Sequence, residues 1–425
     1  MPHSSRLGLA VLCLGSLVVG CTNNQGERST VTTAATSATT LGGSSAESTT
    51  TPAADEYASA IIDEVVDNPA LDGFESKVTN VTDQVGLPGV SLLVVHHGEL
   101  VQQEAWGEYT LDKVVPVASG SKWLTAATVM TLVDDGLIDL DEPIATYLST
   151  MLERLPENRP VMKITMRQLL SFTSGLVADA KFPCVDDPTS TLTDCAATIL
   201  RAGIVHQPGE GFRYGSQHMI VAGAIAELVT GTPYAQLFRE RIAEPLSMDH
   251  TTFVQSGSNG QFENVTNTNP AGKAISTLGD YARFLEMIVH NGVAPDGSRL
   301  LTAESVAEMQ HNQIAGADYI TASPFRVGLL SPYGLGEWLD WTDGDGNALV
   351  LSSDGANGFR PWVDKVNDIF GVYLINDQGE GYVEGDPNAS ADDGGKVHTS
   401  GLWVFTDVAE ALGGSLPKTF YPDRI

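Results

Sequence analysis

Apolar and polar positions follow two patterns in this chain, strand-like towards both ends of the folded part and helix-like in the middle. Short apolar runs bounded by turn residues predict strands at residues 90–95, 100–106, 333–338, 348–352, 359–363 and 369–375. Apolar positions three and four apart predict helices at residues 61–66, 123–133, 166–171, 219–228, 281–289 and 404–412. Strands from distant segments with helices between them predict an α+β fold, an antiparallel sheet flanked by helices plus a mostly helical region.

The N-terminal part lacks such a pattern and is typical of an export signal followed by a linker. An apolar run from Leu7 to Val19, too short to span a bilayer, ends in Val18-Val19-Gly20-Cys21, which is similar to a bacterial lipobox. Residues 22–54 are rich in Ser, Thr, Ala and Gly and cannot bury enough apolar surface to fold. We therefore expect a lipoprotein signal peptide at 1–21, a disordered tether at 22–54 and a folded domain at 55–425. Lipidation of Cys21 would anchor the exported protein to a bacterial membrane, periplasmic or at the cell surface; an ordinary signal peptide with an incidental cysteine is the alternative.

Charge narrows the range of partners. The 425 residues include 23 Lys and Arg against 53 Asp and Glu, a net charge of −30. Such a surface repels phosphate backbones, which excludes nucleic-acid binding, and it offers no basic patch for anionic lipid. The apolar fraction of 42% is sufficient for a large core.

Two cysteines remain for the folded part, Cys184 and Cys195. Their proximity in an exported chain predicts a disulfide. A two-thiol metal site is the alternative, but no nearby histidine pair has the spacing of zinc ligands. The run Asp343-Gly344-Asp345-Gly346-Asn347 is similar to a calcium loop, yet an alanine stands where an EF-hand needs glycine, so a hairpin turn is the better interpretation. We expect no metal or organic cofactor.

The clearest candidate for chemistry is the run Ser119-Gly120-Ser121-Lys122. A serine needs a base within hydrogen-bond reach to become a nucleophile. A spacing of three residues at the start of a predicted helix places Ser119 and Lys122 on one face, and the helix N-terminus favours negative charge there. A buried, deprotonated lysine can accept the serine proton. Taken alone the pattern is common, and an N-capping serine beside a solvated lysine is the competing interpretation.

Several further runs follow in order, and together they are far more specific. With this first run the chain resembles the beta-lactamase-related serine hydrolases, a family with class C beta-lactamases, D-alanyl-D-alanine peptidases and family VIII esterases, over residues 70–410. The runs that carry the resemblance are residues 134–144, 164–176, 212–216, 244–251 and 355–364. The resemblance implies a serine beta-lactamase/penicillin-binding-protein-like fold, with the site between the sheet and the helical region.

The family's second motif, Tyr-x-Asn, corresponds to Tyr214-Gly215-Ser216. The resemblance implies that the Tyr214 oxygen lies between Ser119 and Lys122 and relays a proton to the leaving group. Ser216 replaces the family asparagine, and a hydroxyl lacks the simultaneous donor and acceptor of an amide. This replacement weakens the expectation that amides such as beta-lactams and peptides are recognised.

The third motif, Lys-Thr-Gly or His-x-Gly, corresponds to Ser353-Asp354-Gly355. Gly355 allows close approach of the substrate, and the resemblance implies an oxyanion hole from the backbone N–H groups of Ser119 and Ala356. The cation that helps bind a substrate carboxylate is absent, and the acidic Asp354 would have the opposite effect. The run His398-Thr399-Ser400-Gly401 has similar letters, but we interpret it as a loop entering the terminal helix.

These features predict an exported, lipid-anchored serine hydrolase that acts through a Ser119 acyl-enzyme on a small ester, amide or peptide. An esterase or peptidase-like activity is favoured over a true beta-lactamase, with weak beta-lactam turnover left open. The changed motifs also keep an alternative open, a catalytically impaired surface binding protein on the same fold.

Overall fold

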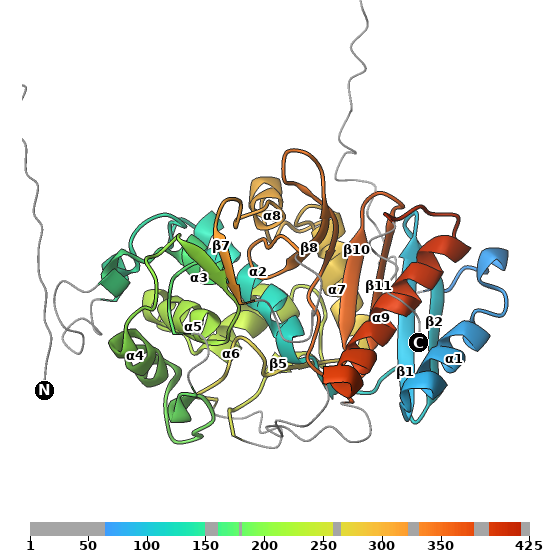
Figure 1. Ribbon diagram of the computed structural model, residues 1–425, viewed down its shortest axis with the longest axis horizontal. Helices are drawn as coiled ribbons and strands as arrows, with labels where there is room; N and C mark the ends of the chain where they lie inside the picture. The colour runs from blue at the N-terminus through green and yellow to red at the C-terminus, as the bar shows by residue number, and fades with distance from the viewer. Residues whose placement is uncertain are drawn as a thin grey trace, which may run out of the picture. The chain divides into compact units, whose positions relative to one another are not determined.

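A six-stranded antiparallel sheet forms the frame, with strand order β2-β1-β11-β10-β9-β8 (Figure 1). The computed structural model describes residues 64–148, 160–177, 181–257, 265–321, 331–377 and 391–417, all within one unit, 53–425. The strands of the sheet are β1 (Gly89–His96), β2 (Glu99–Gly107), β8 (Trp338–Thr342), β9 (Ala348–Ser352), β10 (Arg360–Asp364) and β11 (Ile369–Leu374). The first and last strands of the chain pair with each other, so the sheet is assembled from both ends of the folded part.

Helices cover both faces of this sheet. The helices are α1 (Glu75–Val85), α2 (Ser121–Asp134), α3 (Met166–Leu170), α4 (Leu192–Ala202), α5 (Gln217–Thr230), α6 (Tyr234–Phe238), α7 (Leu278–Val289), α8 (Ala303–Met309) and α9 (Ala391–Ala411). α1 and α9 pack together on one face, and α7 contacts β1, β10 and β11 on the other (Figure 1). Helices α2 to α6 form the mostly helical region. The α+β prediction is confirmed.

Two small sheets tie the helical region together. β3 (Val115–Pro116), β6 (Ala274–Ser276) and β5 (Thr252–Phe253) form one, and β4 (Gly211–Arg213) pairs in parallel with β7 (Asp318–Thr321) in the other. A disulfide joins Cys184 to Cys195 and so links the short turn before α4 to that helix. In the described ranges, no helix combines the length and apolarity needed to cross a bilayer.

α2 is buried along nearly its whole length, from Ser121 to Leu132. Apolar or small residues on every side explain this, because a helix without a polar face belongs in the interior. The consequence for function is that Lys122, in its first turn, has to be buried as well.

Three local predictions were wrong. Residues 333–338, expected to form a strand, do not: Tyr333 makes a single bridge to Trp338, and β8 begins only at Trp338. Val65 and Val66 are not helical: both side chains are exposed, and Val65 forms a single bridge with Leu100, while residues 61–63 lie outside the described ranges. The run 398–401, expected to be a loop, lies inside α9. The predicted signal peptide, tether and Cys21 also lie outside the described residues and stay predictions.

Candidate active site

Ser119 lies in a single 3-10 turn, Ala118–Gly120, directly before α2. Ala118 has a φ of 45°, a left-handed conformation that costs an alanine energy and recurs where a functional group has to be presented. Behind the turn, the Tyr281 hydroxyl donates to the Gly120 carbonyl at 2.8 Å. A Cβ on Gly120 would lie 2.7 Å from the Phe359 ring, so the turn is pressed against the sheet side. The contacts of its neighbours therefore hold the turn that carries the half-buried Ser119.

Lys122 is the immediate partner of Ser119. Its Nζ lies 2.8 Å from Ser119 Oγ and 2.8 Å from the carbonyl oxygen of Ala271. The lysine is 2% exposed, and this burial lowers its pKa from 10.5 to about 7. A carbonyl oxygen can only accept, so a neutral Lys122 donates to Ala271 and keeps its lone pair for the serine proton. At neutral pH about half of the molecules hold the base in this form.

The segment Pro270–Ala274 fixes this geometry through its backbone. Besides the Ala271 carbonyl, Ala274 accepts a hydrogen bond from Val117 N at 3.0 Å and donates its N–H to Ser121 Oγ at 2.9 Å. The Pro270 carbonyl accepts from the Thr125 hydroxyl at 2.7 Å. Sequence reasoning missed this segment because it acts through main-chain atoms, which leave no signature in residue type.

Tyr214 joins the pair from the helical region, between β4 and α5. The Lys122 ammonium lies 4.8 Å from the centre of its ring, which also stacks on Trp338 at 5.2 Å and meets Phe172 edge-on at 5.0 Å. These aromatic neighbours, which the sequence did not single out, orient the ring. Ser216, two residues on, is the half-buried N-cap residue of α5. The structure therefore brings the second motif beside the first.

The third motif approaches from the sheet, in the connection between β9 and β10. Ser353 Oγ donates to the Ser119 carbonyl at 3.3 Å, so this hydroxyl holds the nucleophile's backbone. A Cβ on Gly355 would lie 2.5 Å from the Val117 carbonyl oxygen, which explains why only glycine fits. Ala356 follows, partly exposed. Ser119, Ser353 and Gly355 are thus brought together.

Asp354 corrects the electrostatic expectation for this motif. Successive side chains in an extended segment point to opposite sides; Ser353 and Gly355 face the nucleophile turn, and Asp354 points away. Its carboxylate pairs with Arg360 Nη1 at 2.7 Å, and that guanidinium lies 5.8 Å from the ring of Phe405 in α9. The charge of Asp354 is therefore balanced only in part, because Asp354 shares the Arg360 guanidinium with Asp340.

Two other buried titratable residues lie near the site. Burial raises the pKa of Glu337 to about 8 and lowers that of His218 to about 3. His218 Nδ1 lies 2.8 Å from Ser174 Oγ, and its ring packs against Phe172. At neutral pH the histidine is uncharged and the carboxyl is mostly protonated, so neither adds a full charge to the interior, and burial is what lowers the pKa of Lys122.

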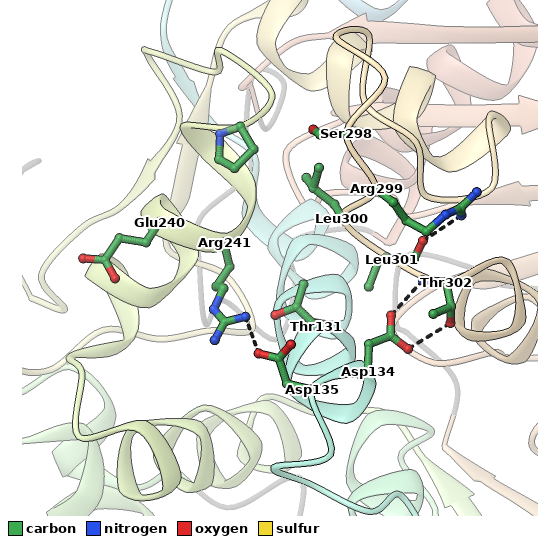
Figure 2. A pocket seen from close by; sticks show the side chains of 11 residues that line it. Thr131, Asp134, Asp135, Glu240, Arg241, Ser298, Arg299, Leu300, Leu301 and Thr302 are labelled. Carbon is green, nitrogen blue, oxygen red and sulfur yellow. Dashed lines mark hydrogen bonds and ion pairs between the residues drawn. The ribbon is translucent and has the colours of Figure 1, made fainter. Parts of the chain in front are cut away.

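A cavity of about 480 Å³ lies at the other end of α2 (Figure 2). Its wall includes Asp134, which accepts hydrogen bonds from Thr302, and Asp135, which pairs with Arg241. These polar groups are hydrogen-bonded or ion-paired with one another, and neither Ser119 nor Lys122 lines the cavity. Among the described residues, no group of three or more His, Cys, Asp or Glu side chains could hold a metal ion.

Comparison with known proteins agrees with this arrangement. The beta-lactamase family pattern matches residues 74–394, and the chain therefore belongs to the beta-lactamase family. Its relatives by fold and family are beta-lactamase-like and penicillin-binding-protein-like serine hydrolases.

Individual relatives are distant. Protein flp of Staphylococcus aureus strain MW2 is 28% identical over 40% of this chain and 36% of its own length, so the chain spans about a third of the first curated relatives it matches. Penicillin-binding protein 4 of Amycolatopsis lactamdurans is 29% identical over 64% of this chain and 75% of its own. A crystal structure from Bacteroides dorei DSM 17855, provisionally described as a beta-lactamase, is 31% identical with a TM-score of 0.67 and covers 81% of this chain and 99% of its own.

Proposed function

We propose that this protein is a serine hydrolase that forms an acyl-enzyme on Ser119 with small esters or amides, esters being the better substrates. One observation carries the proposal: Lys122 is buried, its pKa is lowered to about 7, and its Nζ lies 2.8 Å from Ser119 Oγ. A lysine that is half neutral at physiological pH and aimed at a serine hydroxyl is a general base in position.

The proposed steps combine the geometry of Ser119 and Lys122 with the roles that the family resemblance implies for Tyr214 and Ala356. Lys122 takes the Oγ proton while Oγ bonds to the substrate carbonyl carbon, and the carbonyl electron pair moves to oxygen. The N–H groups of Ser119 and Ala356 stabilise that oxyanion, helped by the N-terminus of α2. When the carbonyl re-forms, the leaving alcohol or amine takes the proton from Lys122, with the Tyr214 hydroxyl as the relay. Water then attacks the acyl-enzyme in the same way and releases the acid and Ser119.

Esters are favoured because an alcohol leaves more readily than an amine and needs less help from proton donation by the site. Ser216 and Ser353 offer hydroxyls where a longer amide or cationic side chain would hold an amide or a carboxylate, and Ser353 is already bonded to the Ser119 carbonyl. Arg360 is occupied by Asp354 and Asp340. These features support short acyl esters ahead of beta-lactams and peptides.

A fluorophosphonate probe tests the proposal, because it labels only an activated serine. We expect stoichiometric labelling of the wild type and none of Ser119→Ala, together with faster turnover of short p-nitrophenyl esters than of nitrocefin or D-alanyl peptides. A well-folded protein that binds these compounds without labelling would instead be a binding protein. Rapid nitrocefin turnover without ester turnover would reverse the substrate order.

For location, we propose export and lipid anchoring at Cys21, supported by the N-terminal sequence alone. Expression in a bacterium with radiolabelled palmitate should label the wild type, and Cys21→Ala should abolish the label. Wild-type protein recovered unlabelled from the medium would contradict this.

A further inference from the structure

A buried charge cluster lies behind the third motif, in a part of the fold that the proposed steps do not use. Arg360, the first residue of β10, bonds through Nη1 to Asp354 at 2.7 Å and through Nη2 to Asp340 of β8 at 2.9 Å. Ser352 Oγ donates to the same Asp340 oxygen at 2.8 Å. All three charged side chains are 4–5% exposed. We name Arg360 with its two carboxylates the Arg360 clamp.

The clamp encloses the segment that faces the nucleophile. Asp354 and Arg360 bracket residues 355–359, with Ala356 between them, and the Gly355 N–H donates to the Phe359 carbonyl at 2.8 Å. The ion pair therefore closes the neck of a short loop whose inner side carries the proposed oxyanion donor. Through Asp340 the same guanidinium also fixes the loop to β8, which is two strands away from β10 in the sheet.

Burial of this cluster is not explained by stability. Two carboxylates and one guanidinium leave a formal excess of one negative charge in the interior, and such clusters are commonly no more stable than apolar residues of the same size. A planar guanidinium with two fixed bonds does, however, define the relative positions of three segments more tightly than apolar contacts. The geometry thus offers positional accuracy where Ser353 and Gly355 meet the segment that carries Ser119.

We propose that Arg360 is a positioning residue, whose clamp with Asp354 and Asp340 holds the backbone of Ala356 at the distance from Ser119 that transition-state stabilisation requires. This inference rests on the proposed hydrolase function. Arg360 does not touch substrate, so its loss changes the rate of acylation and leaves both the binding of substrate and the base Lys122 unaltered.

The test is Arg360→Lys, which keeps the charge and loses the two-bond fork. We expect fluorophosphonate labelling and kcat for a short ester to fall between about tenfold and a hundredfold, the usual effect of a misplaced oxyanion donor. KM should stay within about threefold and the pH midpoint near 7 should not move, because neither substrate contacts nor Lys122 change. Asp354→Asn keeps the shape of the side chain and leaves the bond between Arg360 and Asp340 intact. It should lower labelling and kcat in the same way but by less, and it replaces Arg360→Lys as the test if that variant does not fold.

Arg167→Lys is the matched control. Arg167 in α3 also lies between two carboxylates, Asp141 and Glu308, and neither is among the residues around Ser119. We expect a lowered melting temperature with labelling within about twofold of the wild type. The positioning role of Arg360 would be overturned if both variants fold and label at the wild-type rate. It would also be overturned if they lose no more activity than the Arg167→Lys control. Absence of Ser119-dependent labelling in the wild type would overturn the hydrolase function and the clamp with it.

Discussion

Replacing Lys122 with methionine should stabilise the fold while abolishing activity, and the gain should depend on pH. The folded protein holds this group with a pKa of about 7, against 10.5 when it is exposed in the unfolded chain. Between these values the unfolded state binds more protons, so the wild type gains stability as the pH rises. The lysine therefore costs the fold about 4 kcal/mol at pH 7 and about 2 kcal/mol at pH 9, with one pKa unit worth about 1.4 kcal/mol.

Methionine has a similar length and no charge, so it avoids this cost but leaves the Ala271 carbonyl without its donor. Losing this hydrogen bond costs the variant about 1 kcal/mol at every pH. It therefore shifts the difference in unfolding free energy between variant and wild type by a constant amount and does not change its dependence on pH. Urea unfolding followed by circular dichroism at pH 7, 8 and 9 measures the free energy of unfolding of both proteins. Ser119→Ala, inactive but with its lysine intact, should follow the wild type. A wild-type-to-Lys122→Met difference that stays constant between pH 7 and pH 9 would refute the lowered pKa and the general base with it.

Three further outcomes are expected. Fluorophosphonate labelling of the wild type should rise about tenfold from pH 6 to pH 8 and then level off, as Lys122 loses its proton; a flat profile would exclude it as the base. Gly355→Ala should lower labelling at least about tenfold, because its Cβ would lie 2.5 Å from the Val117 carbonyl oxygen. Gly344→Ala is the control and should leave labelling unchanged, because a Cβ there has no atom within 4 Å. Equal effects of the two substitutions would refute the steric argument. Replacing Cys184 and Cys195 by serine should lower the free energy of unfolding by about 3 kcal/mol in urea, since the bridged residues are 11 apart; an unchanged value would show that the bridge does not constrain the unfolded chain.

Part of the site could be predicted because some of its residues lie in short sequence runs with a recognisable pattern. Ser119 and Lys122 lie one helical turn apart, and Tyr214 lies in a short run with its own pattern. Five of the six strands of the main sheet were also predictable, because buried strands such as β9 and β11 are mostly apolar and end at turn residues; the exception is β8, which starts at Trp338, where the predicted strand was to end.

The rest depends on contacts between distant segments. The Ala271 carbonyl that orients Lys122 is a backbone atom 149 residues away, and any residue type would supply it. Asp354 was seen as an unpaired acid because nothing in the sequence places Arg360 beside it. Val65 and Val66 have helical spacing, yet the β-bridge to Leu100 prevails, since a propensity over a few residues is weak against tertiary contacts.

The pairing of β1 with β11 has a consequence for the time at which the protein becomes chemically active. Ser91 pairs with Leu374, about 280 residues later, so the sheet cannot close before nearly all of the chain has been synthesised. A growing chain exposes Ser119 and Lys122 long before residues 353–356 exist. Neither the buried environment that lowers the lysine pKa nor the oxyanion donor is complete at that stage. Nascent and truncated chains should therefore be unreactive towards acyl esters, and hydrolytic activity should begin only when the two ends of the folded part have met.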